Sequence, residues 1–332
     1  MKQWIGFNML WMFSRGRFDT EGKPLINIEK RELDFIAKYG FTFIRLPLDY
    51  RFWVRDFQYF KVDEAMLEQV DRCVEAVVSR GLHCSLNLHR VPGYCINGNH
   101  LEKHNLWLDT EAQDAFVYQW ELFARRYQSY SPDELSFDLL NEPPNIGQYG
   151  LSRENHKALM ERTVAAIRAI DSDRPLILDG LGGGNIAMPE LTHLGVIHSG
   201  RGYQPMALTH YQASWWEDSK NLPYPAYPGT EYEGRRWTKE TLYVHYAPWR
   251  EVEAQGVPVH IGEFGCYNKI NNEVALRWFR DILSVFREFG WGYALWNFRG
   301  DFGIVDHGRP GTRWETIDGF RVDRELFELI KP

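Results

Sequence analysis

The chain of 332 residues has no apolar run near the roughly 18 uninterrupted residues that a membrane span requires. It also lacks an excess of positive charge: 38 Lys and Arg face 45 Asp and Glu, a net charge of −7. A negatively charged protein is repelled by phosphate backbones and by anionic lipid surfaces. We therefore expect neither nucleic acid nor membranes as partners, and the sequence carries no information on oligomeric state.

Cysteine is scarce, and the four cysteines, at positions 73, 84, 95 and 266, form no Cys-x-x-Cys pair. This spacing favours free thiols in a reducing compartment over a disulfide framework. The N-terminal residues 1–4 lead directly into a strand-like run, without the apolar core or cleavage site of a signal peptide. We expect a cytoplasmic location, the alternative being a secreted protein whose signal peptide has been removed.

No linker rich in Pro, Gly or Ser divides the chain, so residues 1–332 are expected to form a single catalytic domain. Short apolar runs alternate with segments of helical period, the clearest helix being 272–289. The strand candidates are 4–8, 43–48, 84–88, 135–140, 176–179, 206–210, 258–262 and 292–296. Eight alternations of strand and helix predict an α/β protein closed into a single (β/α)8 TIM barrel.

Aromatic residues are abundant, with 13 Trp and 17 Tyr. An aromatic-rich insertion at about 212–241 follows the predicted sixth strand and contains Trp215 and Trp216. A long loop at the C-terminal face of a barrel commonly shapes or covers the substrate site. We expect these two tryptophans, together with Asn297, to be candidate residues of substrate subsites.

Two glutamates end predicted strands. Glu142 follows the apolar run 135–140 and precedes Pro143, which stops the strand, while Glu263 ends the run 257–262. Carboxyl groups at the C-terminal ends of barrel strands point into the usual active-site mouth. A pair of carboxyl groups can serve as acid/base and nucleophile in glycoside hydrolysis, so these two residues are the predicted catalytic pair.

Other polar residues stand at the ends of predicted strands, and the recurrence of this pattern on six strands favours function over coincidence. Taken singly, a strand-end histidine is more often a structural hydrogen-bonder and an arginine more often an ion-pair residue. These candidates are Arg45, His89, Asn141, His210, Tyr211, Trp296 and Asn297.

At these residues the sequence resembles glycoside hydrolase family 5, the cellulase- and mannanase-like retaining β-glycosidases built on a barrel of eight strands. The most specific motif is Asn141-Glu142-Pro143, supported by the segments 262–265, 45–47 and 89–93. The resemblance extends from residue 6 to Trp296. It implies an O-glycosyl hydrolase that needs neither a metal nor an organic cofactor.

The resemblance also implies roles. Glu142 would be the general acid/base with a raised pKa, and Glu263 the ionised nucleophile. Arg45 and the hydroxyl of Tyr211, if they point at Glu263, would favour its charged form. Asn141 would make a hydrogen bond to the sugar 2-hydroxyl. His89 and His210 would hold the first sugar ring and the acid/base by hydrogen bonds. Trp296 would form the floor under the sugar ring that is attacked.

The substrate is expected to be a β-1,4-linked manno- or gluco-oligosaccharide. The missing signal peptide and the aromatic insertion favour an exo-acting enzyme, similar to a β-mannosidase or β-glucosidase. An endo-β-1,4-glucanase or endo-β-1,4-mannanase is the close alternative, and a sugar-binding barrel without activity is a distant one. A barrel enzyme of another chemistry would be expected to show phosphate-binding loops after the seventh and eighth strands, and the segments 265–268 and 299–301 do not resemble such loops. The glycine-rich segment 180–184 lacks the Walker lysine and the dinucleotide fingerprint, so we interpret it as a tight loop at the rim and not as a nucleotide site.

Overall fold

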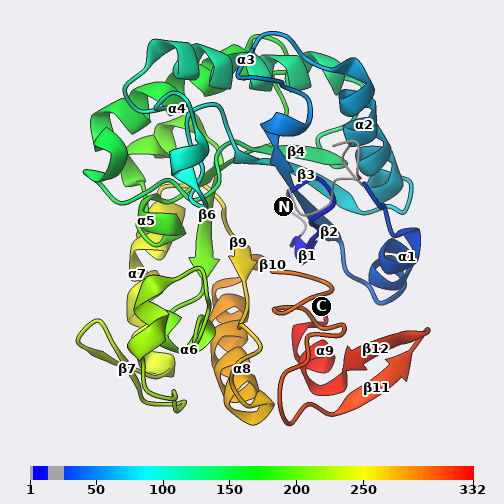
Figure 1. Cartoon of the computed structure of the whole chain (residues 1–332), viewed down its shortest axis with the longest axis vertical. Coiled ribbons are helices and arrows are strands. Elements are labelled where there is room, and N and C mark those ends of the chain that lie inside the picture. Colours follow the sequence, from blue (N-terminus) through cyan, green and yellow to red (C-terminus); the bar gives the residue numbers. More distant parts are fainter. Residues whose placement is uncertain (1–2, 14–25) are drawn as a thin grey trace.

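The computed structural model describes residues 3–13 and 26–332, so part of the predicted domain, residues 1, 2 and 14–25, lies outside the described residues. The sequence predicted a closed barrel, and parallel strands do close into one, in the order β1-β10-β9-β6-β5-β4-β3-β2 (Figure 1). The barrel strands are β1 (Ile5–Asn8), β2 (Phe43–Asp49), β3 (His83–Arg90), β4 (Leu135–Asp138), β5 (Leu176–Asp179), β6 (Ile197–Gly202), β9 (Val259–Phe264) and β10 (Gly292–Leu295).

Helices surround the barrel, and neighbouring helices pack in pairs such as α3 with α4 and α7 with α8 (Figure 1). Their bounds are α1 (Lys30–Lys38), α2 (Glu64–Val78), α3 (Thr110–Arg126), α4 (Arg153–Arg168), α5 (Leu181–Gly184), α6 (Met206–Thr209), α7 (Lys239–Glu253), α8 (Asn272–Phe289) and α9 (Arg324–Ile330). Within the described ranges, no helix combines the length and the apolar character needed to cross a membrane.

Helix α8 shows how the sequence specifies an element. Asn271 caps its first turn by accepting a hydrogen bond from the backbone N–H of Glu273 at 2.9 Å. Gly290 ends it with a φ of 73°, in the left-handed region that glycine adopts without steric cost. Its apolar stripe, which includes Phe279 and Leu283, is fully buried against the barrel. The helix has the bounds that the periodicity predicted.

The barrel interior is layered. At its N-terminal end, an apolar cluster formed by Trp4, Phe43, Ile177, Ile197 and Ala294 fills the space between the strands. Toward the carboxyl ends of the strands, the buried side chains become polar and charged. The apolar plug therefore supports a polar layer at the opposite end, which is where a TIM barrel places its active site.

The predicted sixth strand is wrong. Residues 206–210 do not form a strand: Met206–Thr209 is the short helix α6, which follows Pro205, and the barrel strand is Ile197–Gly202. The true strand has no apolar signature because it carries inward polar residues and glycines. A side chain at Gly202 would meet the Cβ of Phe264 at 2.4 Å, so the close approach of β6 to β9 requires glycine there.

The predicted insertion at 212–241 has different limits in the structure. The connection between β6 and α7 runs from residue 203 to 238 and contains α6, a 3-10 helix (Glu217–Asn221) and the hairpin β7 (Thr230–Tyr232) and β8 (Arg235–Trp237). A second excursion after β10 holds the antiparallel pair β11 (Trp314–Ile317) and β12 (Phe320–Asp323), which periodicity did not reveal. All four cysteines are free and buried.

Candidate active site

Arg45 is a central connection of the polar layer. It rises from β2, opposite Asn8 of β1 in the strand register, and is 1% exposed. Its Nε donates to Asp138 Oδ2 at 2.6 Å, its Nη2 donates to Asn141 Oδ1 at 2.9 Å, and its Nη1 donates to both Asn8 Oδ1 and Glu263 Oε1. One guanidinium thereby ties the ends of β1, β2, β4 and β9 together.

Arg201 is a second guanidinium in the same layer. It lies on β6, directly opposite Glu263 of β9, at a register shift between Gly200 and Arg201. Its Nε donates to Glu142 Oε1 at 3.0 Å, and its Nη2 donates to Asn141 Oδ1 at 2.9 Å and lies 3.5 Å from Glu263 Oε1. Both predicted catalytic carboxyl groups therefore face one arginine.

Glu142 stands just past the end of β4 with a φ of 47°, in the left-handed region that a residue with a side chain rarely adopts. Its backbone is held on both sides: the N–H donates to Asp179 Oδ2 at 3.0 Å, and the carbonyl accepts from the hydroxyl of Tyr94 at 2.6 Å. Such local strain is often found at functional sites, where surrounding contacts maintain it.

The side chain of Glu142 is 17% exposed, and its carboxyl group has an unusual proton affinity. Burial and the nearby negative charge of Glu263 raise the pKa of Glu142 to about 8, against the opposing effect of Arg201. At neutral pH this group is therefore mostly protonated, which is the state that a general acid needs.

Glu263 has a different environment. Its side chain is 4% exposed, and Oε1 accepts from Arg45 and lies close to Arg201, while Oε2 accepts from the hydroxyl of Tyr203 at 3.0 Å. Both of its oxygens therefore face positively charged or hydrogen-bond-donating groups. The two glutamates thus have the contrasting environments that separate an acid from a nucleophile.

The charge balance of the polar layer explains this contrast. Four carboxyl groups share two guanidinium groups, and the carboxyl groups belong to Asp138, Glu142, Asp179 and Glu263. Burial also raises the pKa of Asp138 to about 7. Because uncompensated buried charge is costly, the cluster retains protons, and Glu142, whose pKa is raised by burial and by the charge of Glu263, is a favoured place for one.

Asn141 and His89 form a hydrogen-bond chain with a defined direction. Asn141 Oδ1 accepts from both arginines, so its Nδ2 faces His89 Nε2, 3.2 Å away, and donates to it. His89 Nδ1 then carries the proton and donates to Asn87 Oδ1 at 3.2 Å. Burial and the neighbouring arginines lower the pKa of His89 well below its usual value, in agreement with a neutral ring.

Aromatic rings lie beside this chain. The ring of His89 has Phe13 at 3.9 Å and Trp296 at 5.4 Å between centroids, and the indole of Trp296 is stacked at 26° to the imidazole. Trp296 follows β10 and is partly exposed. This places an indole face next to His89 at the mouth of the barrel.

The predicted contact between Tyr211 and Glu263 is wrong, because Tyr203 donates this hydrogen bond. Tyr211 packs on Tyr224 instead, with centroids 5.4 Å apart, and its hydroxyl accepts from Gln212. The error follows from the prediction of the sixth strand, which placed its end at residue 210, whereas the strand ends at residue 202.

His210 likewise does not hold Glu142. Among the described residues, Arg201 donates to the Glu142 carboxylate, whereas His210 Nδ1 lies 3.0 Å from Thr209 Oγ1. The imidazole packs beside Tyr203, with centroids 5.1 Å apart, and burial lowers the pKa of His210 to about 4. An arginine from β6 therefore occupies the place where the family resemblance implied a histidine.

Members of the polar layer that sequence reasoning missed include Asn8, Asp138, Asp179, Arg201 and Tyr203. A signal existed for two of them. Residues 199, 201 and 203 alternate with glycines, so a strand would place Ser199, Arg201 and Tyr203 on one face. Asp138 lies within the apolar run 135–140, and Asp179 ends the apolar run 176–179. Only closure of the barrel shows that both side chains point into its interior.

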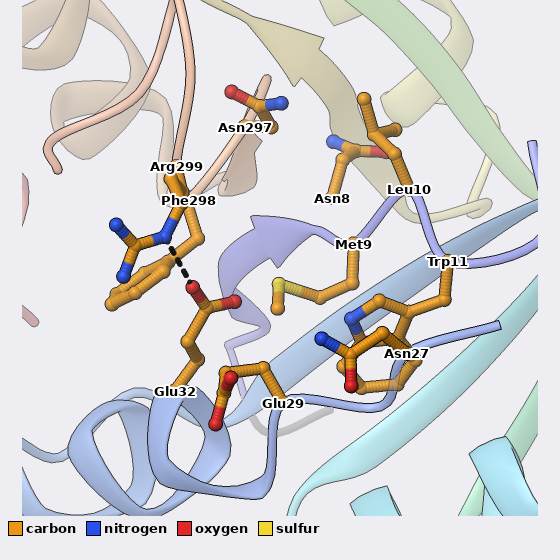
Figure 2. A pocket seen from close by; sticks show the side chains of 10 residues that line it. All are labelled: Asn8, Met9, Leu10, Trp11, Asn27, Glu29, Glu32, Asn297, Phe298 and Arg299. Carbon is orange, nitrogen blue, oxygen red and sulfur yellow. Dashed lines mark hydrogen bonds and ion pairs between the residues drawn. The ribbon is translucent and has the colours of Figure 1, made fainter. Parts of the chain in front are cut away.

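Two of the three candidate subsite residues lie beside His210, with the ring centroids of Trp215 and Trp216 at 6.3 and 6.2 Å from that of His210. Trp215 is 55% exposed, has its ring 4.9 Å from that of Tyr267, and stands near His210, while Trp216 packs toward the hairpin at Tyr232. Asn297 lines a cavity of about 170 Å³ to which Asn8, a residue of the polar layer, also contributes (Figure 2). Figure 2 shows the ion pair between Glu32 and Arg299 on the same cavity, with Arg299 Nε 2.7 Å from Glu32 Oε1.

Within the ranges 3–13 and 26–332, no three His, Cys, Asp or Glu side chains are grouped as metal ligands. The absence of a cofactor stays a prediction from the sequence.

Comparison with known proteins identifies the chemistry of this arrangement. Residues 3–301 match the family model described as cellulase, glycosyl hydrolase family 5. Endoglucanase C of Acetivibrio thermocellus is 29% identical over 335 residues, covering 92% of this chain and 93% of that protein. Cellodextrinase A of Ruminococcus flavefaciens is 26% identical over 302 residues, covering 84% and 80%.

A crystal structure described as that of a glycoside hydrolase superposes with a TM-score of 0.95 at 59% identity, covering 99% of this chain and 98% of that one. The family match spans the barrel and includes both glutamates of the polar layer. The chain therefore belongs to glycosyl hydrolase family 5 and is a retaining glycoside hydrolase.

Proposed function

We propose that this enzyme is an endo-acting β-1,4-glucanase in which Glu142 is the general acid/base and Glu263 the nucleophile. The observation that carries the catalytic assignment is the shared guanidinium of Arg201, which faces both carboxyl groups. Of the two, Glu142 is the one with the raised pKa and the larger exposure, and Glu263 is the one surrounded by donors.

In the first step, Glu263 attacks the anomeric carbon while Glu142 gives its proton to the leaving oxygen. The glycosidic bond breaks, a covalent glycosyl-enzyme forms, and the free end of the substrate departs as an alcohol. We assign the attack to Oε2 of Glu263, because Oε1 faces two arginines and Oε2 has the single hydrogen bond from Tyr203.

The second step reverses the proton transfer. Once Glu263 is esterified, its negative charge disappears, and one of the causes that raise the pKa of Glu142 disappears with it. The hydrogen bond from Arg201 Nε then favours the carboxylate of Glu142. Glu142 accordingly accepts a proton from water, which attacks the anomeric carbon and releases the sugar with its configuration retained.

Neighbouring residues support these steps. Asn141 Nδ2 has two hydrogens and directs one to His89, which leaves the other for the sugar 2-hydroxyl. Trp296, stacked near His89, forms the floor under the attacked ring. Tyr203 takes the supporting role at Glu263 that the sequence assigned to Tyr211.

The choice of an endo-acting glucanase is supported by the relatives. Endoglucanase C and this chain match over more than nine-tenths of both lengths, and the name of that protein states endo action on a glucan. The exposed rings of Trp215 and Tyr224, 55% and 54% accessible, provide flat faces on which sugars can stack beyond the cleaved bond.

The test is a time course on cello- and manno-oligosaccharides labelled at the reducing end, with products resolved by length. Internal cuts of the cello series, yielding mixed oligomers, are expected. Stepwise release of single sugars would contradict the endo assignment, and preference for the manno series would contradict the glucanase assignment. Glu142→Gln, shown to be folded by its cooperative thermal unfolding, is the control that shows the cleavage comes from this site.

A second candidate is the exo-acting enzyme, similar to a β-mannosidase or β-glucosidase, that the sequence favoured. It is supported by the ring cluster of His210, Trp215, Tyr267 and Phe302 beside Tyr203, which could block one end of the binding site. The same time course distinguishes it, because a blocked end yields one sugar per cut. Trp215→Ala would then convert single-sugar release into mixed products.

A further inference from the structure

The positive charge of Arg201 lies next to Glu142, a carboxyl group that has to stay protonated to act as an acid. Arg201 donates to Glu142 at 3.0 Å with Nε, and its side chain is fully buried, so solvent does not weaken its field. A bare guanidinium at that distance favours the carboxylate form and would lower the pKa of the acid. A general acid, however, has to hold its proton until the leaving oxygen arrives.

Asp179 provides the opposing charge. It lies at the end of β5, with no exposed side-chain surface, and accepts from both terminal nitrogens of Arg201, Nη1 at 2.9 Å and Nη2 at a shorter distance. The same carboxylate accepts the backbone N–H of Glu142 at 3.0 Å. Asp179 thus contacts both the arginine and the acid/base that the arginine holds.

We propose that Asp179 is a positioning residue that neutralises Arg201, so that the arginine orients the Glu142 carboxyl by hydrogen bonding without forcing it to ionise. This inference rests on the proposed acid/base role of Glu142. It assigns a function in the reaction to the ion pair between Asp179 and Arg201, which would otherwise be explained as a structural contact between β5 and β6.

The charged and titratable groups around Glu142 come from several elements. Arg201 and Tyr203 face it from β6 and the segment after it, Asp179 from β5, Glu263 from β9, and Tyr94 from the segment after β3. Glu263 and Asp179 both raise the pKa of Glu142, whereas Arg201 lowers it. Removing the charge of Asp179 alone shifts this balance toward Arg201.

The decisive variant is Asp179→Asn, which keeps the shape of the side chain and removes its charge. The basic limb of the pH profile of kcat/KM reports the loss of the proton from Glu142 in the free enzyme. We expect this limb to move to lower pH by about one unit or more, the size of shift that one close, uncompensated charge produces. A limb within about half a unit of wild type in folded protein would overturn the proposal.

Asp138→Asn is the matched control. It removes the charge of another buried aspartate in the same layer, but Asp138 is bound to Arg45 through Nε rather than to Arg201. Its activity is expected to fall, while its basic limb moves by less than that of Asp179→Asn. Equal shifts in the two variants would mean that total charge, not the Asp179 to Arg201 pair, sets the protonation of Glu142.

The double variant D179N/R201Q removes both charges and keeps a donor at position 201. It is expected to return the basic limb toward the wild-type pH, and a limb that stays with the single variant would overturn the proposal. If Asp179→Asn does not fold, Arg201→Lys tests the orienting part: kcat/KM should fall about tenfold more on cellobiosides with poor leaving groups than on dinitrophenyl cellobioside, where a loss reports only the contacts of Arg201 with Glu263 and Asn141. Equal falls on both substrates would mean a structural role.

Failure of the proposed glucanase function is distinguishable from failure of this inference. If the wild-type enzyme cleaves no β-glucoside, the protonation of Glu142 is measured directly by carbon NMR of protein labelled at glutamate carboxyl groups. Glu142→Gln identifies the resonance. A lower midpoint in Asp179→Asn than in wild type supports the inference without any turnover, and an unchanged midpoint overturns it.

Discussion

Arg201 on β6 lies directly opposite Glu263 on β9, and its Nη2 is 3.5 Å from Glu263 Oε1 while its Nε donates to Glu142. Two carboxyl groups that share one guanidinium influence each other's protonation. Ionised Glu263 raises the proton affinity of Glu142, and its esterification lowers it again. The geometry of one strand register thereby couples the two steps of the reaction.

Replacing the acid/base should affect substrates according to their leaving groups. Glu142→Gln should lower kcat/KM by about 10²- to 10⁴-fold on alkyl or sugar leaving groups, because proton donation is lost. The variant should keep most of its kcat/KM on dinitrophenyl cellobioside, because the dinitrophenolate group leaves without needing a proton. Comparable losses on both substrates would contradict the assignment.

Replacing the nucleophile should stop turnover on every substrate. Glu263→Gln cannot form the glycosyl-enzyme, so dinitrophenyl cellobioside should be inert as well. With wild-type enzyme, a 2-deoxy-2-fluoro glycoside with a reactive leaving group should accumulate as a covalent adduct. Mass spectrometry of the digested protein should place the added sugar on the peptide that contains Glu263, and an adduct elsewhere would refute the role.

The pH profile should have its basic limb near pH 8. The enzyme acts when Glu142 is protonated, and burial together with Glu263 raises the pKa of Glu142 to about 8. As pH rises through this value the acid ionises, so kcat/KM on a poor leaving group should fall. On dinitrophenyl cellobioside the same limb should be weak or absent, because that substrate does not need the acid.

The same proton should be visible in stability. An unfolded glutamate has a pKa near 4.5, so the folded protein, with a value of about 8, loses stability as pH rises between these two values. Glu142→Gln carries no such penalty. Its gain in free energy of unfolding over wild type should therefore grow from about pH 5 to pH 8 by a few kcal/mol, at about 1.4 kcal/mol per pKa unit. Urea unfolding at both pH values tests this, and a constant difference would contradict it.

Replacing Tyr203 or Tyr211 by phenylalanine tests which hydroxyl donates the hydrogen bond to Glu263. Tyr203→Phe removes the hydroxyl that donates to Oε2, and a hydrogen bond to a charged group is worth roughly 1.5–3 kcal/mol, so kcat should fall about tenfold to a hundredfold. Tyr211→Phe removes a hydroxyl that accepts from Gln212 and should leave kcat near wild type. A larger loss in Tyr211→Phe would restore the role that the sequence suggested.

The sequence allowed the barrel to be predicted because seven of its strands are short apolar runs bounded by helical segments. It failed at β6, whose residues Ser199, Gly200, Arg201 and Gly202 follow no apolar pattern. A strand that carries site residues inward and glycines outward loses the hydrophobic signal on both faces. The nearby apolar run 206–210 was predicted as the strand instead. The prediction therefore chose His210 and Tyr211 as the residues at its end, in place of Arg201 and Tyr203.

What the sequence alone determined is the pair of strand-end glutamates and the elements that present them, because strand alternation and proline stops act over a few residues. Only the tertiary structure decided which groups surround them. Arg45, Asp179 and Arg201 come from three strands, and their contacts exist only because the closed barrel brings those strand ends together at one register. Protonation depends on such contacts, since burial and neighbouring charges, not local sequence, separate an acid from a nucleophile.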